Sequence, residues 1–152
     1  MEISSLLLAA EARSINGRLY VTGGGYAVHE VEDLPEEATL HLGVGVHAEP
    51  GEDVSDAVLL AHVEALSGEP VAGEPARTPL RFPHEDEPLA GAPVAGGFAL
   101  DVSFQAREAG AHRLVVRVRT PGGEVERTLP FAVRARSPEP GPRPEGGDTA
   151  SG

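Results

Sequence analysis

The stretch HRLVVRVRTPGGEVER, residues 112–127, alternates apolar and polar side chains on both sides of a Pro-Gly turn. Alternation with a period of two is typical of a β-strand with one buried face. Pairing Thr120 with Gly123 brings apolar residues together on one face and opposite charges together on the other, which favours this register. The facing pairs are then Val118 with Val125, Leu114 with Leu129, Arg119 with Glu124, and Arg117 with Glu126. Arg127 does not fit the apolar face, and Pro130 indicates an edge or a bulge because it lacks an amide donor.

The same alternation recurs along most of the chain and predicts a β-sheet protein. Thr39–Ala48 and Phe98–Ala106 alternate most clearly, and Thr78–Phe82 is expected to be a short edge strand. Ala57–Leu66 is an alanine- and leucine-rich run that could be a strand or a helix, and its neighbours favour a strand. Short strands with turns every 8–12 residues predict an all-β, Ig-like antiparallel β-sandwich of about seven to nine strands.

The N-terminal segment, Met1–Arg13, imitates a secretory signal but begins with an acidic residue and carries two serines in its apolar run. We therefore expect a buried first strand and a cytoplasmic protein. Asn16-Gly17 predicts a type I′ hairpin turn, with Arg18–Thr22 as the return strand. Tyr26–Glu32 is the next expected strand, with Tyr26, Val28 and Val31 as packing residues.

Charge is distributed unevenly along the 152 residues, whose net charge is −12. Residues 1–75 carry 14 acidic and two basic residues, whereas residues 76–152 carry ten of each. This balance argues against nucleic-acid binding, and no apolar run is long enough to cross a membrane. The uneven distribution of charge predicts one strongly negative side of the sandwich and a nearly neutral final hairpin. Residues 136–152 are rich in Pro and Gly and are expected to form a disordered tail after a domain at 1–135.

The sequence holds no recognisable catalytic or cofactor-binding constellation, so we expect no enzyme activity and no cofactor. Gly23-Gly24-Gly25 lacks the residues of a phosphate-binding loop and is interpreted as a bulge or crossover of strands. The six histidines are scattered, and His84–Glu87 lacks the spacing of a calcium loop. Cysteine is absent, and no serine lies in a nucleophile elbow.

Two groups of residues remain as candidate interaction sites. The first is the outward row Arg113, Arg117 and Arg119, of which two face glutamates, so that a neutralised sheet surface is favoured over a free basic one. The second comprises Gly23, Gly24, Gly25 and Tyr26. His112 opens the penultimate strand, where Ig-like domains often place a tyrosine that ties down a loop, and we expect its ring to do the same.

Four motifs resemble a family of short, mainly actinobacterial proteins, a domain of unknown function with a predicted Ig-like β-sandwich. The motifs are NGRLYVTGGGY (16–26), FALDVSF (98–104), GAHRL (110–114) and LPFAVR (129–134). The family usually has Trp where this chain has Tyr26, and Tyr where it has His112. The resemblance implies a fold but no activity, cofactor or substrate.

Our leading hypothesis is a non-catalytic interaction or scaffold module that binds a protein, with the acidic side facing a partner with a basic surface or with the chain forming a homodimer. The first alternative is a small-molecule or carbohydrate-binding sandwich that uses the 71–97 loop and Gly23–Tyr26. The second is an enzyme with an unrecognised site. A deep pocket lined by Tyr20, Tyr26 or Phe82 would favour the ligand, and a flat exposed apolar patch would favour a protein.

Overall fold

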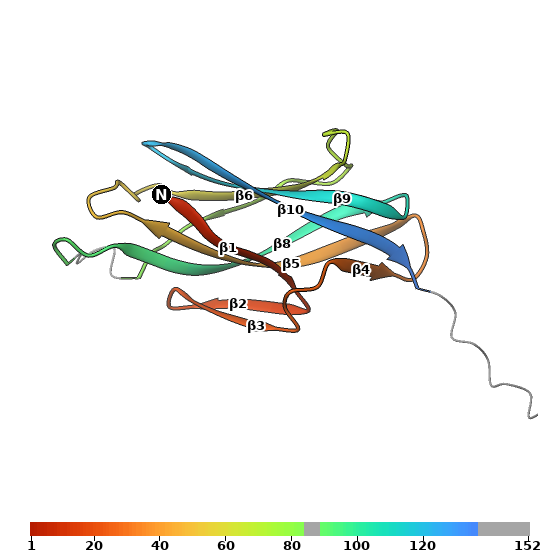
Figure 1. The fold of residues 1–152 in the computed structure, drawn as a ribbon, viewed down its shortest axis with the longest axis horizontal. Helices are drawn as coiled ribbons and strands as arrows, with labels where there is room; N and C mark the ends of the chain where they lie inside the picture. Colours follow the sequence, from red (N-terminus) through yellow and green to blue (C-terminus); the bar gives the residue numbers. More distant parts are fainter. Residues whose placement is uncertain (84–88, 137–152) are drawn as a thin grey trace, which may run out of the picture.

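The computed structural model describes residues 1–83 and 89–136, which form ten β-strands and no helix (Figure 1). A three-stranded sheet has the order β1-β5-β8, a five-stranded sheet has the order β4-β10-β9-β6-β7, and β2 and β3 form a separate hairpin. The strands are β1 (Glu2–Ala9), β2 (Glu11–Ile15), β3 (Arg18–Thr22), β4 (Val28–Val31), β5 (Glu36–Ala48), β6 (Val58–Ala65), β7 (Ala76–Pro79), β8 (Val94–Ala106), β9 (Gly110–Thr120) and β10 (Gly123–Ala135). None of the described residues forms a helix long and apolar enough to cross a membrane.

The sheet order is that of an Ig-like sandwich, as the sequence predicts. Without β2, β3 and β4, seven strands remain, and their first, second and fifth form one sheet while their third, sixth and seventh form the other. The fourth, β7, joins the second sheet at the edge of β6. The count of ten exceeds the expected seven to nine because β2–β4 are inserted between the first two strands. One pair also departs from the antiparallel expectation, since β4 runs parallel to β10.

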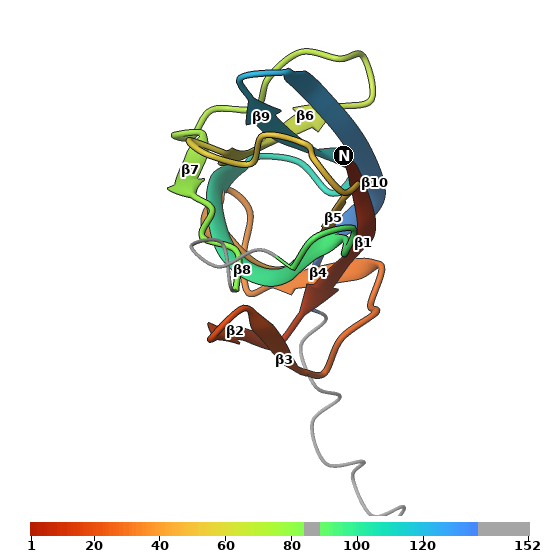
Figure 2. The ribbon, with the colours of Figure 1, turned by 90° about the vertical axis from the view of Figure 1, so that its left-hand side faces the viewer.

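The core lies between the two sheets, inside the ring of strands seen end-on in Figure 2. Alternate residues of β5 point into it, and Leu40, Leu42, Val44 and Val46 are almost completely buried. Ala57–Leu66 is a strand, because β6 pairs with both β9 and β7 and buries alternate side chains. Among the described residues, most of the buried apolar side chains lie at inward positions of the strands of both sheets, as the period of two predicts.

The C-terminal hairpin has the predicted register throughout, from Thr120 opposite Gly123 to Leu114 opposite Leu129. Arg127, which did not fit the apolar face, reaches across the edge of the sandwich and donates from Nη1 to the Ile3 carbonyl at 3.1 Å. Pro130 lies where β10 has β9 on one side only, since β4 pairs only with residues 132–135. The missing amide therefore leaves no ladder bond unmade.

The structure departs from the predictions in three further places. The first strand pairs with β5, and the Asn16-Gly17 turn joins β2 to β3 in a hairpin that belongs to neither main sheet. Val28 is exposed while Val31 is buried, because residues three apart on a strand point to opposite faces. The edge strand is Ala76–Pro79, two to three residues before its expected position. The proposed tail, from residue 137 on, lies outside the described residues.

Candidate interaction surfaces

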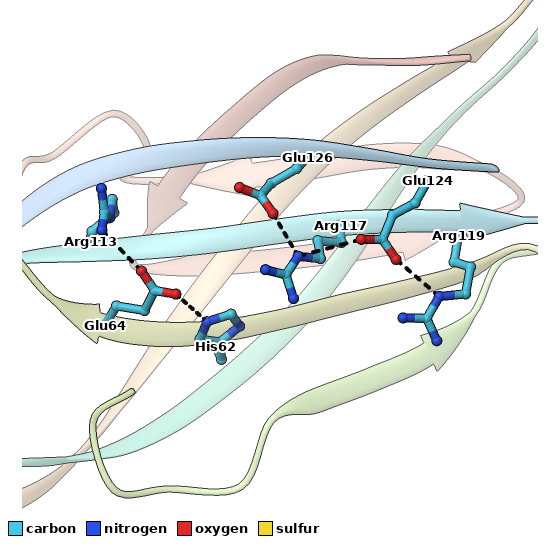
Figure 3. Close-up of polar contacts among 7 residues, drawn as sticks. All are labelled: His62, Glu64, Arg113, Arg117, Arg119, Glu124 and Glu126. Atoms are coloured by element: carbon cyan, nitrogen blue, oxygen red, sulfur yellow. Dashed lines mark hydrogen bonds and ion pairs between the residues drawn. The ribbon is translucent and has the colours of Figure 1, made fainter. Parts of the chain in front are cut away.

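The arginine row lies on the outer face of the five-stranded sheet, where each arginine meets a glutamate (Figure 3). Arg117 Nε donates to Glu126 at 2.6 Å and lies 3.6 Å from Glu124, and Arg119 Nε donates to Glu124 at 3.0 Å. Both pairs are those that the hairpin register predicts. This face is therefore neutralised in place, and its arginines are not free cations for an acidic partner.

The third arginine, Arg113, pairs across β9 and β6 with a residue that the sequence reasoning did not single out. Its Nη2 donates to Glu64 at 3.1 Å, and His62 Nε2 donates to the same carboxylate at 2.8 Å. The hydrogen bond from His62, together with the charge of Arg113, holds the pKa of Glu64 below its usual value. The side chain of Glu64 is only 15% exposed. Arg113 Nε is also buried, and it has no hydrogen-bond partner among the described residues. Below this row Val115, which points outward, is only 2% exposed.

Gly23-Gly24-Gly25 returns the chain from the hairpin to β1, as the crossover interpretation predicts. Ala10 N donates to the Gly23 carbonyl at 3.2 Å, and Gly25 N donates to the Leu8 carbonyl at 2.8 Å. A Cβ on Gly24 would lie 2.7 Å from Val21 Cγ1 and 2.9 Å from Leu7 Cδ1, so the side chains of these two residues fill the space beside it. The backbone hydrogen bonds of Gly23 and Gly25 therefore tie this segment to the end of β1.

Tyr26 follows these glycines and is half-buried. Its hydroxyl lies 3.3 Å from His29 Nδ1. Burial raises the pKa of Tyr26. Burial also lowers the pKa of His29, although the negative charge of Glu36 opposes this shift and the charge of His41 adds to it. Tyr26 and His29 therefore pack together as a small polar contact beside the outer face of β5.

The β2–β3 hairpin packs on the outer face of the three-stranded sheet, outside the ring of strands in Figure 2. The Gly97 amide donates to the Gly17 carbonyl at 2.8 Å, and Ser14 Oγ donates to the Gly97 carbonyl at 2.5 Å. A Cβ on Gly97 would lie 2.5 Å from Leu19 Cβ, and one on Gly43 would lie 3.0 Å from Leu19 Cδ2. Glycines on this face thus form a platform on which the hairpin rests directly on the backbone.

The opposite face of the hairpin points to solvent and exposes two large apolar side chains. Ile15 is 52% exposed and Tyr20 is 54% exposed. Each lies directly opposite an arginine, because Ile15 pairs with Arg18 and Tyr20 pairs with Arg13. These are the only two basic residues among residues 1–75. We call Ile15, Arg18, Tyr20 and Arg13 the hairpin face. In the sequence, this face could have been found from its two arginines, which stand out in an otherwise acidic half of the chain.

His112 has the loop-fixing contact that the sequence predicts. Its Nδ1–H donates to the Gly110 carbonyl at 2.9 Å, at the turn into β9. The ring is 8% exposed and stacks on Phe131, with centroids 5.7 Å apart. In the described ranges, 1–83 and 89–136, no three His, Cys, Asp or Glu side chains are grouped to hold a metal ion. His84–Glu87 lies outside the described residues.

Three hollows on the described surface do not have the lining that the ligand hypothesis expects. One of about 560 Å³ lies between residues 50–55 and 89–94, and one of about 340 Å³ lies beside Ser103 and Gln105. A third, of about 300 Å³, lies beside Thr120 and Glu124. None of these three is lined by Tyr20, Tyr26 or Phe82. The aromatic side chain most open to solvent in the described residues is Tyr20, on the flat hairpin face.

No family model and no curated protein matches the chain, so the resemblance to an actinobacterial family stays a prediction. Among solved structures, the chain is similar to part of a family 123 glycoside hydrolase from Clostridium perfringens, whose structural analysis concerns glycolipid glycan hydrolysis. The similarity has 10% sequence identity and a TM-score of 0.35, and it covers 72% of this chain. The chain spans 23% of the length of that protein. A similarity this weak supports no conclusion about activity.

Proposed function

We propose that the protein is a non-catalytic interaction module and that the hairpin face binds a protein partner. The observation that carries the proposal is the exposure of Ile15 and Tyr20 on a hairpin fixed to the sandwich by backbone hydrogen bonds. A side chain that is exposed on a rigid support loses little conformational entropy when it binds. Tyrosine and arginine are also the residue types that most often dominate binding energy at protein interfaces.

Charge suggests how such a partner would approach. The unpaired acidic residues of the first half attract a basic surface over long distances. On the hairpin face itself, Arg13 is already paired with Glu11 at 2.5 Å, so that Arg18 is the basic residue there that would meet a carboxylate of the partner. We therefore expect the partner to place an apolar pocket over Tyr20 and to meet the acidic loops with basic residues.

The test is affinity capture from a lysate of the source organism with three immobilised full-length proteins. These are the wild type, the variant Ile15→Ser with Tyr20→Ser, and the control Leu66→Ser, which removes a 63% exposed apolar side chain at a distant turn. A partner held through the hairpin face should bind wild type and control, and bind the double variant at least tenfold more weakly.

Equal capture by all three proteins would contradict the assignment of the hairpin face. Capture of no protein, together with a thermal shift caused by a small metabolite, would contradict the interaction module itself and favour the ligand-binding alternative.

A further inference from the structure

A second surface, separate from the hairpin face, lies on the outer face of β5 and β8 beyond the part that the hairpin covers. Three successive cross-strand pairs there are polar throughout. We call them the polar row: Glu37 with Gln105, Thr39 with Ser103, and His41 with Asp101. The row spans four residue-to-residue steps, from residue 37 to residue 41, and is therefore about 13 Å long.

Two of the three pairs are held in place by hydrogen bonds of their own. Thr39 Oγ1 and Ser103 Oγ are 2.9 Å apart, and His41 Nδ1 lies 2.7 Å from Asp101 Oδ1. Each group keeps further capacity, because His41 retains Nε2 and Asp101 retains its second oxygen. The row therefore presents both donors and acceptors, and hydrogen bonds already orient the side chains of two of its three pairs.

One end of the polar row opens into the hollow of about 340 Å³. Its far wall is the loop at Gly73 and Glu74, which is fixed to β8 because Gln105 N donates to the Ala72 carbonyl at 2.8 Å. Gly73 has a φ of +152°, and a Cβ there would lie 2.7 Å from the Ser103 carbonyl oxygen. The wall thus rests directly on the strand, and the hollow has the size of a small ligand site.

The charges of this site restrict what it can bind. Glu37 and Glu74 line the hollow and Asp101 lies on the row, so an anion would be repelled. Hydroxyl groups, by contrast, both donate and accept, and they match a row of carboxylate, amide, hydroxyl and imidazole groups. We propose that the polar row and its hollow bind a neutral polyhydroxylated molecule, such as a sugar, independently of the hairpin face.

The experiment is an amide NMR titration of the full-length protein with neutral monosaccharides and disaccharides of glucose, galactose and mannose. Glucosamine and glucuronic acid serve as cationic and anionic forms of the same ring. We expect at least one neutral sugar to cause saturable shifts at residues 36–41 and 101–105, and glucuronic acid to cause none.

Two variants locate the binding. Thr39→Val with Ser103→Ala removes the central hydroxyl pair at exposed positions, and should weaken binding at least tenfold. Thr128→Val makes the same change at an exposed position of the other sheet and should leave the affinity unchanged. The Ile15→Ser, Tyr20→Ser variant should also bind the sugar normally, which separates this site from the proposed function.

Three outcomes would overturn the proposal: no saturable binding by any neutral sugar, shifts that the Thr39→Val, Ser103→Ala change does not weaken, or binding of glucosamine alone. The last result would show a cation site in place of a polyol site.

Discussion

The two sheets cover their outer faces in opposite ways. The three-stranded sheet has glycines at Gly43 and Gly97 and accepts the β2–β3 hairpin against its backbone. The five-stranded sheet has long charged side chains, which pair with one another (Figure 3). The hairpin can pack on the three-stranded sheet because glycines have no side chains there. The outer face of the five-stranded sheet is instead covered by charged side chains that pair with one another.

This difference decides how each face responds to change. The contact at Gly97 has no slack, since a Cβ there would meet Leu19 Cβ and the Leu19 backbone, which cannot turn away. An exposed ion pair is weak, because water screens it and the side chains lose entropy when they are held. The glycine contact under the hairpin should therefore be sensitive to single atoms, whereas most of the charged outer face of the five-stranded sheet should tolerate substitution.

The largest effect is expected from Gly97→Ala. The added Cβ would lie 2.5 Å from Leu19 Cβ and 2.8 Å from Leu19 N, so the hairpin must move away. We expect the free energy of unfolding to fall by about 1–3 kcal/mol, the usual effect of an extra methyl group in a filled contact. Urea denaturation measures this fall, and faster amide exchange at residues 11–22 would locate it.

Gly122→Ala is the matched control, because the nearest atom to its Cβ would be Thr120 Oγ1 at 3.8 Å. That change should leave stability unaltered or raise it slightly. If Gly97→Ala changes the free energy of unfolding as little as Gly122→Ala does, the contact between the hairpin and Gly97 is not tight. The two sheets would then not differ in their sensitivity to substitution.

The next effect tests whether the charged face is uniform. Glu64→Ala removes an acceptor from both His62 and Arg113, and leaves Arg113 with its Nε already buried and unpartnered. We expect the free energy of unfolding, measured by chemical denaturation, to fall by about 1–2 kcal/mol. Glu124→Ala, at a 38% exposed position, should change stability by less than about 1 kcal/mol. Equal losses would mean that burial does not distinguish the two ends of the row.

Acid titration sharpens the same point. The hydrogen bond from His62 and the charge of Arg113 hold the pKa of Glu64 below its usual 4.5. A carboxylate of this kind contributes stability that is complete above the unfolded-state pKa and is lost as pH falls through the native pKa. The wild type should therefore lose more stability than Glu64→Gln between about pH 5 and pH 3. Glu69→Gln makes the same change of charge at an exposed turn; if it flattens the pH dependence equally, Glu64 has no special role.

The sequence predicted those parts of the fold whose pairing is local. The final hairpin could be predicted from a two-residue turn and the alternation of apolar and polar residues alone. The four expected facing pairs are all confirmed: Val118–Val125, Leu114–Leu129, Arg119–Glu124 and Arg117–Glu126. The strand at Ala57–Leu66 is confirmed as well, because its neighbours in sequence are strands.

What the sequence missed depends on contacts between distant segments. Nothing near Asn16-Gly17 shows that its hairpin leaves the main sheets and lies against Gly97, about 80 residues away. The glycines at 43 and 97 indicate a close approach but not what approaches. Glu64 was missed for the same reason: its partner Arg113 is on another strand, and only the pairing of β6 with β9 brings them together.

The smallest effect is expected at the exposed end of the charged face. Arg119 is 59% exposed and has one ion pair, so Arg119→Ala should change the free energy of unfolding by no more than about 0.5 kcal/mol. That difference should vanish in 1 M NaCl, where the Debye length is about 3 Å. A larger loss that survives high salt would mean that Arg119, Glu124, Arg117 and Glu126 act as one network. A double-mutant cycle of Arg119→Ala with Glu126→Ala would then show coupling between residues that do not touch, and the charged face would have to be regarded as no less cooperative than the glycine platform.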